Sequence, residues 1–406
     1  MQVQSVQRYL LCASNIWEKL MNNLNLPEVF ETFSEQRKNS FIKVREYRDK
    51  GTPIVGAYCT YFPKELVTAI GGVAVSLCAT SDETIGAAEE ELPKNLCPLI
   101  KSSYGFAKTD KCPCFYFSDL VVGETTCDGK KKMYEYMRRF KDVHVMQLPQ
   151  NQEEESFKLW VSEIKKMANR LEDKYRVKIT EDRLISAIKL ENAVREELMG
   201  ISELMKEDNP ALTGTELFNI LRGSEYRFDK EELVTELKRI KENLIEQSRV
   251  ITNGIKSSSR PMRILLTGCP IGGVFDKVVP VIESNGGLVV AYENCNGMKN
   301  VANPVLLEGD LYENIARRYL DIGCSVMSPN KNRMDSIDSL IEEYKVDGIM
   351  EILLPMCHTY SVESGLIKTV AKKHKIPFIS ITTDYSSADS EQVKLRISAF
   401  TEMFNG

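Results

Sequence analysis

Six of the eleven cysteines fall into two evenly spaced groups of three, one group in each half of the chain: Cys59, Cys97 and Cys127, then Cys295, Cys324 and Cys357. Three thiolates are one ligand short of a closed, four-coordinate structural zinc site. They can hold a four-iron cubane and leave one iron free for a group other than the protein. The two groups therefore predict two cubanes, or one larger composite cluster.

The positions of these cysteines favour a ligand role. Cys97 and Cys324 lie in predicted loops, and the other four lie at or just past the end of a predicted strand. In open α/β sheets, ligands collect outside the carboxyl ends of the strands. Cys59, Cys127 and Cys357 also precede predicted helices, whose free N–H groups stabilise thiolate charge. The alternative is that these cysteines are buried in the apolar core. Burial of this kind is a good explanation for a single cysteine, but a poorer one for six cysteines at such positions.

The remaining five cysteines are expected to bind no metal: Cys12, Cys78, Cys112, Cys114 and Cys269. The Cys112-Pro113-Cys114 pair lacks the two-residue spacing of zinc knuckles and thioredoxin-type motifs. Cys269 lies in the glycine-rich loop 268–273, which fits neither the dinucleotide-binding fingerprint nor the P-loop. We interpret this loop as a place where the backbone approaches a ligand or a cluster closely.

Two ionisable residues adjoin the predicted cluster ligands. His358 directly follows Cys357, so its imidazole can donate a proton or a hydrogen bond near the metal. Structural support of the neighbouring ligand is the alternative role. Glu293 precedes Cys295 by two residues and is a weaker candidate of the same kind. His358 and Glu293 are therefore the predicted catalytic residues.

Strands and helices alternate in both halves of the chain. Strands are predicted at residues 53–58, 73–78, 115–122, 143–148, 263–267, 288–292, 348–353 and 377–381. Helices are predicted at residues 63–70, 130–140, 275–284, 311–320, 335–344, 361–374 and 390–404. This alternation indicates parallel sheets covered on both faces. The predicted fold class is α/β, with two Rossmann-like parallel-sheet domains, an inserted helical segment, and the cluster between the domains.

The chain is expected to divide into four parts. These are an N-terminal helical extension (1–27), a first α/β domain (28–150), a helical linker segment (151–258) and a second α/β domain (259–406). Residues 257–261 mark the last boundary. The linker segment carries capping signals at Thr213-x-x-Glu216 and Asp229-x-x-Glu232. Its apolar residues recur at helical spacing, as in Leu233, Leu237, Ile240 and Leu244.

Composition argues against several kinds of partner. The net charge is −5, and the short basic run at 130–132 is interpreted as a solvated helix face, so no nucleic acid partner is expected. No apolar run reaches the roughly 18 residues of a membrane helix, and the N-terminus lacks the build of a signal peptide. Eleven cysteines in such a chain are more consistent with reduced thiols than with disulfides. A cytoplasmic location and no membrane partner are the expectations.

Several stretches resemble one superfamily. They are YCTYFPKEL (58–66) and LPKNLCPLIKSSYG (92–105), together with residues 119–132, 292–295, 322–325, 357–360 and 383–386. They are similar to the 2-hydroxyacyl-CoA dehydratase and benzoyl-CoA reductase superfamily. Within it, the resemblance is greatest to the double-cubane cluster proteins. It extends from about residue 28 onward, and residues 1–27 have no recognisable counterpart.

The resemblance implies a cofactor and partners. It implies a double-cubane [8Fe-9S] cluster, with three of the six cysteines for each cubane, and a homodimer. It also implies a separate ATP-dependent iron–sulfur reductase as activator, and a small-molecule substrate that is reduced at the cluster. The chain has no P-loop motif of its own, which agrees with ATP being handled by the partner. A buried, negatively charged cluster resists reduction, so an ATP-driven donor is a physically sensible requirement.

Two other functions remain open from the sequence. The chain could be one subunit of a 2-hydroxyacyl-CoA dehydratase with a single [4Fe-4S] cluster, which needs only three cysteines. It could also be a non-enzymatic protein that stores electrons or carries a cluster. The iron and sulfide content per chain separates the first function from the second. Turnover with a candidate substrate, the reductase and ATP separates the first function from the third.

Overall fold

The computed structural model describes residue 40 and residues 42–254 and 260–405. The predicted extension 1–27, Cys12, and most of the predicted boundary at 257–261 lie outside these residues. Within the described part of the chain, no helix has the length and apolar character needed to cross a membrane.

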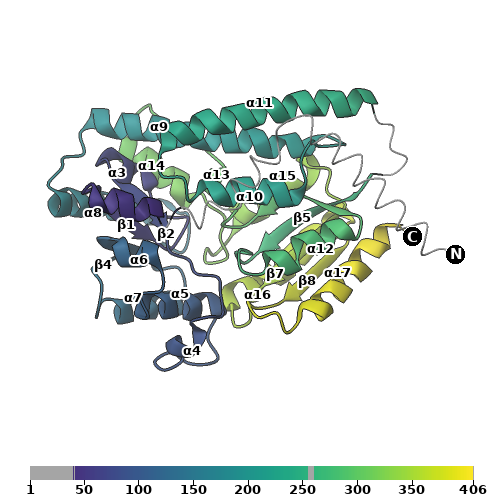
Figure 1. The fold of residues 1–406 in the computed structure, drawn as a ribbon, viewed down its shortest axis with the longest axis horizontal. Coiled ribbons are helices and arrows are strands. Elements are labelled where there is room, and N and C mark those ends of the chain that lie inside the picture. Colours follow the sequence, from purple (N-terminus) through teal and green to yellow (C-terminus); the bar gives the residue numbers. More distant parts are fainter. Residues whose placement is uncertain (1–39, 41, 255–259, 406) are drawn as a thin grey trace.

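Two four-stranded parallel sheets form the framework of the molecule (Figure 1). The first contains β1 (Ile54–Ala57), β2 (Val73–Ser76), β3 (Leu120–Glu124) and β4 (Val143–Met146), in the order β2-β1-β3-β4. The second contains β5 (Met262–Gly268), β6 (Gly287–Glu293), β7 (Gly348–Leu353) and β8 (Phe378–Thr382), in the order β6-β5-β7-β8. All residues of β5, β6 and β7 are buried, as expected for parallel strands covered on both faces. The predicted α/β class with two parallel-sheet units is confirmed.

One predicted strand in the first half is wrong at its start. Residues 115–122 were expected to be extended, but α6 occupies Pro113–Phe117 and β3 begins only at Leu120. Pro113 occupies the first turn of α6, where its missing N–H costs little. The Cys112 sulfur caps this helix by accepting a hydrogen bond from the Phe115 N–H at 3.4 Å. The periodicity of a short apolar run does not distinguish a helix from a strand. Here the proline and the cysteine cap favour the helix.

The other helices of the first half connect its strands. They are α3 (Lys64–Ala69), α4 (Ile85–Ala88), α5 (Pro98–Lys108) and α7 (Asp128–Met137). The predictions of α3 and α7 are confirmed, whereas α4 and α5 were not predicted. Helix α5 begins directly after Cys97, so this cysteine precedes a helix and does not lie in an isolated loop.

The predicted helical segment is confirmed. It comprises α8 (Glu154–Tyr175), α9 (Glu181–Glu203), α10 (Gly214–Ser224) and α11 (Lys230–Gly254). Thr213 and Glu216 form a full capping box, and the Asp229 carboxylate accepts from the Glu232 N–H at 3.0 Å. Figure 1 shows α9 and α11 side by side, extending across the molecule from one sheet toward the other.

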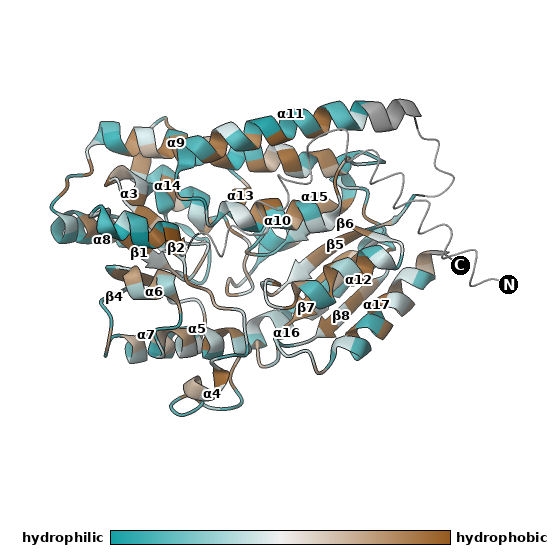
Figure 2. Cartoon of the chain, viewed as in Figure 1, coloured by the Kyte–Doolittle hydropathy of each residue, from teal (hydrophilic) through white to brown (hydrophobic). Residues whose placement is uncertain are grey.

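Hydrophobic patterning explains how α11 is held. Figure 2 shows brown, hydrophobic residues alternating with teal, hydrophilic ones along α11. The predicted apolar stripe is fully buried in the core, at Leu233, Leu237, Ile240 and Leu244. One stripe of leucine-type side chains at helical spacing is sufficient to fix the orientation of such a helix.

The second half contains six α-helices in the described residues. They are α12 (Val279–Ser284), α13 (Met298–Val301), α14 (Leu311–Leu320), α15 (Lys331–Glu343), α16 (His358–His374) and α17 (Ser390–Asn405). Helix α16 begins three residues before its predicted start, so His358 is its first residue. Helix α15 begins four residues before its predicted start.

Helix α14 packs on the first half of the molecule. Its residues Ile315 and Tyr319 share a hydrophobic cluster with Val55 of β1 and Leu66 of α3. Figure 1 shows α14 beside α3, and it also packs against α8. The segment that follows α14, including Cys324, therefore returns from the first half toward the second sheet.

Candidate metal centre

All six predicted ligand cysteines line one cavity of about 530 Å³: Cys59, Cys97, Cys127, Cys295, Cys324 and Cys357. Three of them come from the first half of the chain and three from the second. The predicted catalytic residue His358 lines the same cavity. Ligands are expected at such a position, outside the carboxyl ends of parallel strands.

Local structure explains how each thiol reaches the cavity. Cys97, Cys127 and Cys357 occupy the N-cap positions of α5, α7 and α16. Cys59 follows β1 and Cys295 follows β6 by two residues. Cys324 lies in the loop after α14, where the Asn330 side chain donates a hydrogen bond to its carbonyl oxygen at 2.8 Å. Strand ends and helix starts thus bring thiols to a place where N–H groups favour negative charge.

The thiols group in space differently from their order in sequence. Cys59 lies close enough to Cys295 and Cys324 that, in addition to burial, their thiolates raise its pKa. Cys357 instead groups with Cys97 and Cys269, whose thiols donate hydrogen bonds to its thiolate and lower the pKa of Cys357 to about 3. The Cys357 thiolate, together with burial, raises the pKa values of Cys97 and Cys269. Each spatial group therefore contains cysteines from both halves of the chain.

These residues fit an iron–sulfur cluster better than a single ion. Within the described residues, the only three metal-ligand atoms that lie within 4.8 Å of one another belong to Asp338, Glu342 and His374, none of which lines the cavity. In a cubane each thiolate binds a different iron, so its ligands stand farther apart than those of one ion. Three buried cavity oxygens also lack a hydrogen-bond partner among the described residues, those of Thr126, Asn296 and Ser325. The two hydroxyls among them can donate to cluster sulfur.

The remaining described cysteines occupy several environments, and all ten described cysteines are free of disulfides. Cys78 lines the cavity, and its thiol donates to the Tyr58 carbonyl oxygen at 2.9 Å. Cys269 is buried, and its sulfur accepts from the Leu354 N–H at 3.4 Å. Cys112 and Cys114 belong to the α6 region and do not line the cavity. That these cysteines bind no metal stays a prediction. Cys78 is the strictest test of it, because Cys78 lines the cavity.

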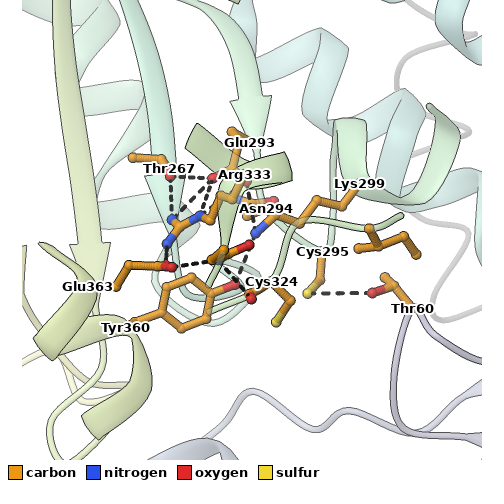
Figure 3. Close-up of polar contacts among 12 residues, drawn as sticks. Thr60, Thr267, Glu293, Asn294, Cys295, Lys299, Cys324, Arg333, Tyr360 and Glu363 are labelled. Atoms are coloured by element: carbon orange, nitrogen blue, oxygen red, sulfur yellow. Dashed lines mark hydrogen bonds and ion pairs between the residues drawn. The ribbon is translucent and has the colours of Figure 1, made fainter. Parts of the chain in front are cut away.

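Glu293 lies in a buried ion-pair network behind the cavity (Figure 3). Its carboxylate is 2.9 Å from the Lys299 ammonium and 3.2 Å from the Arg333 guanidinium, and it accepts from the Thr267 hydroxyl. Burial alone would raise the pKa of Glu293, but the two cations outweigh it and the pKa is lowered. An ionised, fully paired carboxylate outside the cavity lining is poorly suited to donate protons there, so this role for Glu293 stays a prediction without structural support.

Tyr360 connects this network to the cavity and was missed by sequence reasoning. Lys299 donates to its hydroxyl at 3.2 Å, and the Arg333 guanidinium stacks on its ring at 4.8 Å. Tyr360 also lines the cavity. Its position three residues after Cys357, in the first turn of α16, was the available signal.

The interpretation of residues 130–132 as a solvated helix face is wrong for Lys130. Its ammonium donates to the Tyr58 carbonyl oxygen at 2.9 Å and lines the cavity. Lys130 lies in the first turn of α7, three residues after Cys127. Only Lys132 of the three is exposed.

Comparison with known proteins identifies the family. A model of the 2-hydroxyglutaryl-CoA dehydratase D-component matches residues 59–404. The chain is 50% identical to a putative dehydratase subunit, YjiM, of Escherichia coli K12, over 93% of this chain and 98% of that protein. It is 24% identical to the (R)-phenyllactyl-CoA dehydratase beta subunit of Clostridium sporogenes, over 93% of this chain and 99% of that protein.

A third relative is the (R)-2-hydroxyglutaryl-CoA dehydratase subunit beta of Acidaminococcus fermentans, 22% identical over 93% of this chain and 98% of that protein. The chain therefore belongs to the 2-hydroxyglutaryl-CoA dehydratase D-component family. The expected membership of the 2-hydroxyacyl-CoA dehydratase superfamily is confirmed.

Proposed function

We propose that this chain is an iron–sulfur enzyme that holds a double-cubane [8Fe-9S] cluster with Cys59, Cys97, Cys127, Cys295, Cys324 and Cys357. It takes low-potential electrons from an ATP-hydrolysing iron–sulfur reductase and reduces a small-molecule substrate at the cluster. One observation carries the proposal: six thiols, three from each half of the chain, line a single cavity.

The residues of the chain bind and shield the cluster. Helix N-termini at Cys97, Cys127 and Cys357 offer N–H groups to thiolate charge. Lys130 adds a positive charge beside Cys59. When bound, the cluster supplies electrons to a small molecule at its iron or bridging-sulfide face. His358, in the cavity wall, delivers the proton that must accompany each electron.

The partners follow from the same proposal. Burial of a negatively charged cluster makes its reduction unfavourable, so an ATP-driven activator supplies the driving force. The enzyme is proposed to act as a homodimer.

A second candidate function is favoured by the comparisons. The matching family and two of the relatives are named for 2-hydroxyacyl-CoA dehydratases. On this alternative the chain is one subunit of such a dehydratase and holds a single [4Fe-4S] cluster. Three of the six cavity cysteines would then be left without metal.

Anaerobic reconstitution tests the two functions. The double-cubane proposal predicts the iron and sulfide content of two cubanes per chain, and loss of cluster on replacement of any of the six cysteines. The dehydratase alternative predicts half that iron and indifference to three of the six replacements. Full iron content without turnover, in the presence of ATP, reductase and candidate substrates, would instead support a storage or carrier protein.

A further inference from the structure

Buried cations in this protein are paired with carboxylates or, in the case of Arg263 and Arg318, donate to several backbone carbonyl oxygens. Arg195 lies 2.5 Å from Glu65, Lys299 lies 2.9 Å from Glu293, and Arg333 pairs with Glu363. Such pairing is the rule, because an isolated charge away from water is costly. Two lysines in the wall of the cavity depart from this rule.

These two lysines are Lys64 and Lys230. Both line the cavity and are half-buried, and neither has a carboxylate within ion-pair distance among the described residues. The Lys64 ammonium donates to the Asn300 side-chain oxygen at 3.1 Å. The Asn300 amide in turn donates to Glu225 at 3.0 Å. Lys230 makes no side-chain hydrogen bond to the part of the chain that the structure describes.

Four elements bring these groups together. Lys64 begins α3 and Lys230 begins α11, whereas Asn300 lies in α13 and Glu225 follows α10. All four residues line the cavity. The first half, the helical segment and the second half each contribute, so the arrangement exists only in the folded chain. The helical segment is thus part of the cavity wall as well as a connection between the sheets.

The carboxylates near these two lysines are engaged elsewhere or lie beyond ion-pair distance. Burial would raise the pKa of Glu191, but the charges of Lys230, Arg195 and Lys64 outweigh it and the pKa is lowered. Burial, and secondarily the Lys230 charge, lower the pKa of Lys64 to about 8. Burial raises the pKa of Glu225, which weakens it as a counter-ion. The other charged neighbours of Lys64 are Glu191 and Arg195, and Glu191 accepts from the Thr68 hydroxyl at 2.8 Å while Arg195 pairs with Glu65. An incoming anion would satisfy both ammonium groups.

The cluster itself is not the expected anion at this place. The cations that act on the thiols of Cys59 and Cys295 are Lys130 and Lys299. Lys299 also pairs with Glu293, so charge on that side is already compensated. Lys64 and Lys230 therefore belong to a separate polar part of the same cavity.

We propose that Lys64 and Lys230, with Asn300 orienting Lys64, bind an oxyanion group of the substrate beside the thiol-lined part of the cavity. This inference rests on the proposed function and specifies its substrate as a small molecule that carries a carboxylate or phosphate. The oxyanion has two possible sources, a free carboxylic acid or the phosphate groups of an acyl-CoA.

Binding measurements on the reconstituted protein test the proposal. Dissociation constants for acetate and for coenzyme A are measured by calorimetry at low chloride, for the wild type and for Lys64→Met, Lys230→Met and the double variant. Each charge-assisted hydrogen bond lost should weaken binding by about 10- to 100-fold. Methionine keeps the length of the side chain and removes a poorly compensated charge, so folding should be retained.

A matched control separates local charge from net charge. Lys131 also lines the cavity, but it pairs with the exposed Asp128 at 2.9 Å. Lys131→Met should leave both dissociation constants unchanged. Weaker acetate binding in the Lys64 and Lys230 variants identifies a small acid as the source of the oxyanion, and an effect on coenzyme A alone identifies a CoA ester. Equal affinity of wild type and double variant for both probes would overturn the proposal.

Iron and sulfide analysis of the same samples keeps the two proposals distinguishable. The lysine variants should retain the full wild-type iron content. If the wild type binds no iron but its anion binding depends on Lys64 and Lys230, the cluster proposal fails and the oxyanion site stands. If the variants lose iron together with anion binding, these lysines support the cluster and the oxyanion site is wrong.

Discussion

The two sheets share one strand order, β2-β1-β3-β4 and β6-β5-β7-β8, so each strand of the first has a counterpart in the second. In each sheet a cysteine follows each of the first three strands. They are Cys59, Cys78 and Cys127 after β1, β2 and β3, and Cys269, Cys295 and Cys357 after β5, β6 and β7. Only Cys269 of these six does not line the cavity. Corresponding cysteines of the two sheets therefore differ in whether they line the cavity.

Cys269 and Cys59 differ by one residue in their position along the strand. After β5, the Cys269 N–H donates to the Ile352 carbonyl and continues the ladder to β7. After β1, the residue that continues the ladder, by donating to the Val122 carbonyl, is Tyr58. Cys59 comes one residue later, so its side chain leaves the chain on the side opposite that of Tyr58. Both Tyr58 and Cys59 line the cavity. Pro270, the true counterpart of Cys59, lines the cavity in the second sheet.

Position alone does not distinguish the cysteines that follow β2 and β6, because Cys78 and Cys295 both line the cavity. Cys78 donates its thiol proton to the Tyr58 carbonyl at 2.9 Å. Among the described residues, the sulfur of Cys295 accepts a hydrogen bond only from the Thr60 hydroxyl, at 4.0 Å. A thiol engaged as a donor keeps its proton, whereas a metal ligand must lose it. We therefore predict that Cys295 binds metal and that Cys78 does not.

The largest expected effect is loss of the cluster. Cys295→Ser should lose iron, and Cys78→Ser, its matched control at the corresponding strand end, should retain the wild-type content. Cys127→Ser and Cys357→Ser, at the β3 and β7 ends, should both lose iron. Iron and sulfide are measured after anaerobic reconstitution. Iron loss in Cys78→Ser would show that the second strand end carries a ligand in both sheets.

The second prediction compares a buried carboxyl from each sheet. Glu293 is paired with Lys299 and Arg333, whereas both oxygens of Glu124 lack a hydrogen-bond partner among the described residues. Glu293→Gln leaves two buried cations undercompensated and should cost about 3–5 kcal/mol of unfolding free energy. Burial raises the pKa of Glu124 to about 8, so at pH 6 Glu124→Gln replaces one neutral group by another in the folded protein and removes an ionisation that favours the unfolded chain. It should therefore cost no unfolding free energy. Denaturant unfolding at pH 6 measures both, and equal losses would contradict the difference.

The third prediction concerns His358, at the start of α16 beside Cys357. His358→Ala should retain iron and cluster reduction while slowing turnover by about 10²-fold, the lower range for a positioned proton donor. His374→Ala is the control, because His374 ends the same helix and contacts Asp338 at the surface at 2.7 Å. Loss of the cluster in His358→Ala would show that His358 supports the metal site structurally. Unchanged turnover would show that protons arrive by another group.

The last prediction is a pH dependence of stability. Glu124 keeps its proton in the folded protein up to about pH 8, whereas its reference pKa is 4.5. Between these values the unfolded chain releases a proton that the folded protein retains, so stability falls as pH rises. The contribution is about 1.4 kcal/mol per pH unit. The difference in unfolding free energy between wild type and Glu124→Gln should follow this slope from pH 5 to 8, and a constant difference would contradict the raised pKa.

Much of the fold could be predicted from the sequence because its signals are local. Strand–helix alternation predicted all eight strands, although the third was placed too early, and the capping signals at Thr213 and Asp229 were confirmed. The apolar stripe of α11 was read directly from its period. Helix α6 and the start of α16 were missed, because a short apolar run and a cysteine cap carry little periodic signal.

The placement of the cysteines relative to the strands and helices could also be predicted from the sequence alone. Each of the six thiols is attached to a strand end, a helix start or a loop, and the sequence specifies these attachments through local patterns. That six separate segments converge on one cavity followed from the general geometry of parallel sheets. Their role as ligands remains a prediction that iron analysis can test.

Only the tertiary structure decided which side chains surround that cavity and in what charge state. Cys59 neighbours Cys295 and Cys324 because α14 packs on the first sheet and returns the chain toward the second. Glu293 is paired because Arg333, forty residues later, reaches it through the buried network. Lys64, Glu225, Lys230 and Asn300 meet from four elements. Long-range packing sets these burial and charge relations, and no local pattern in the sequence encodes them.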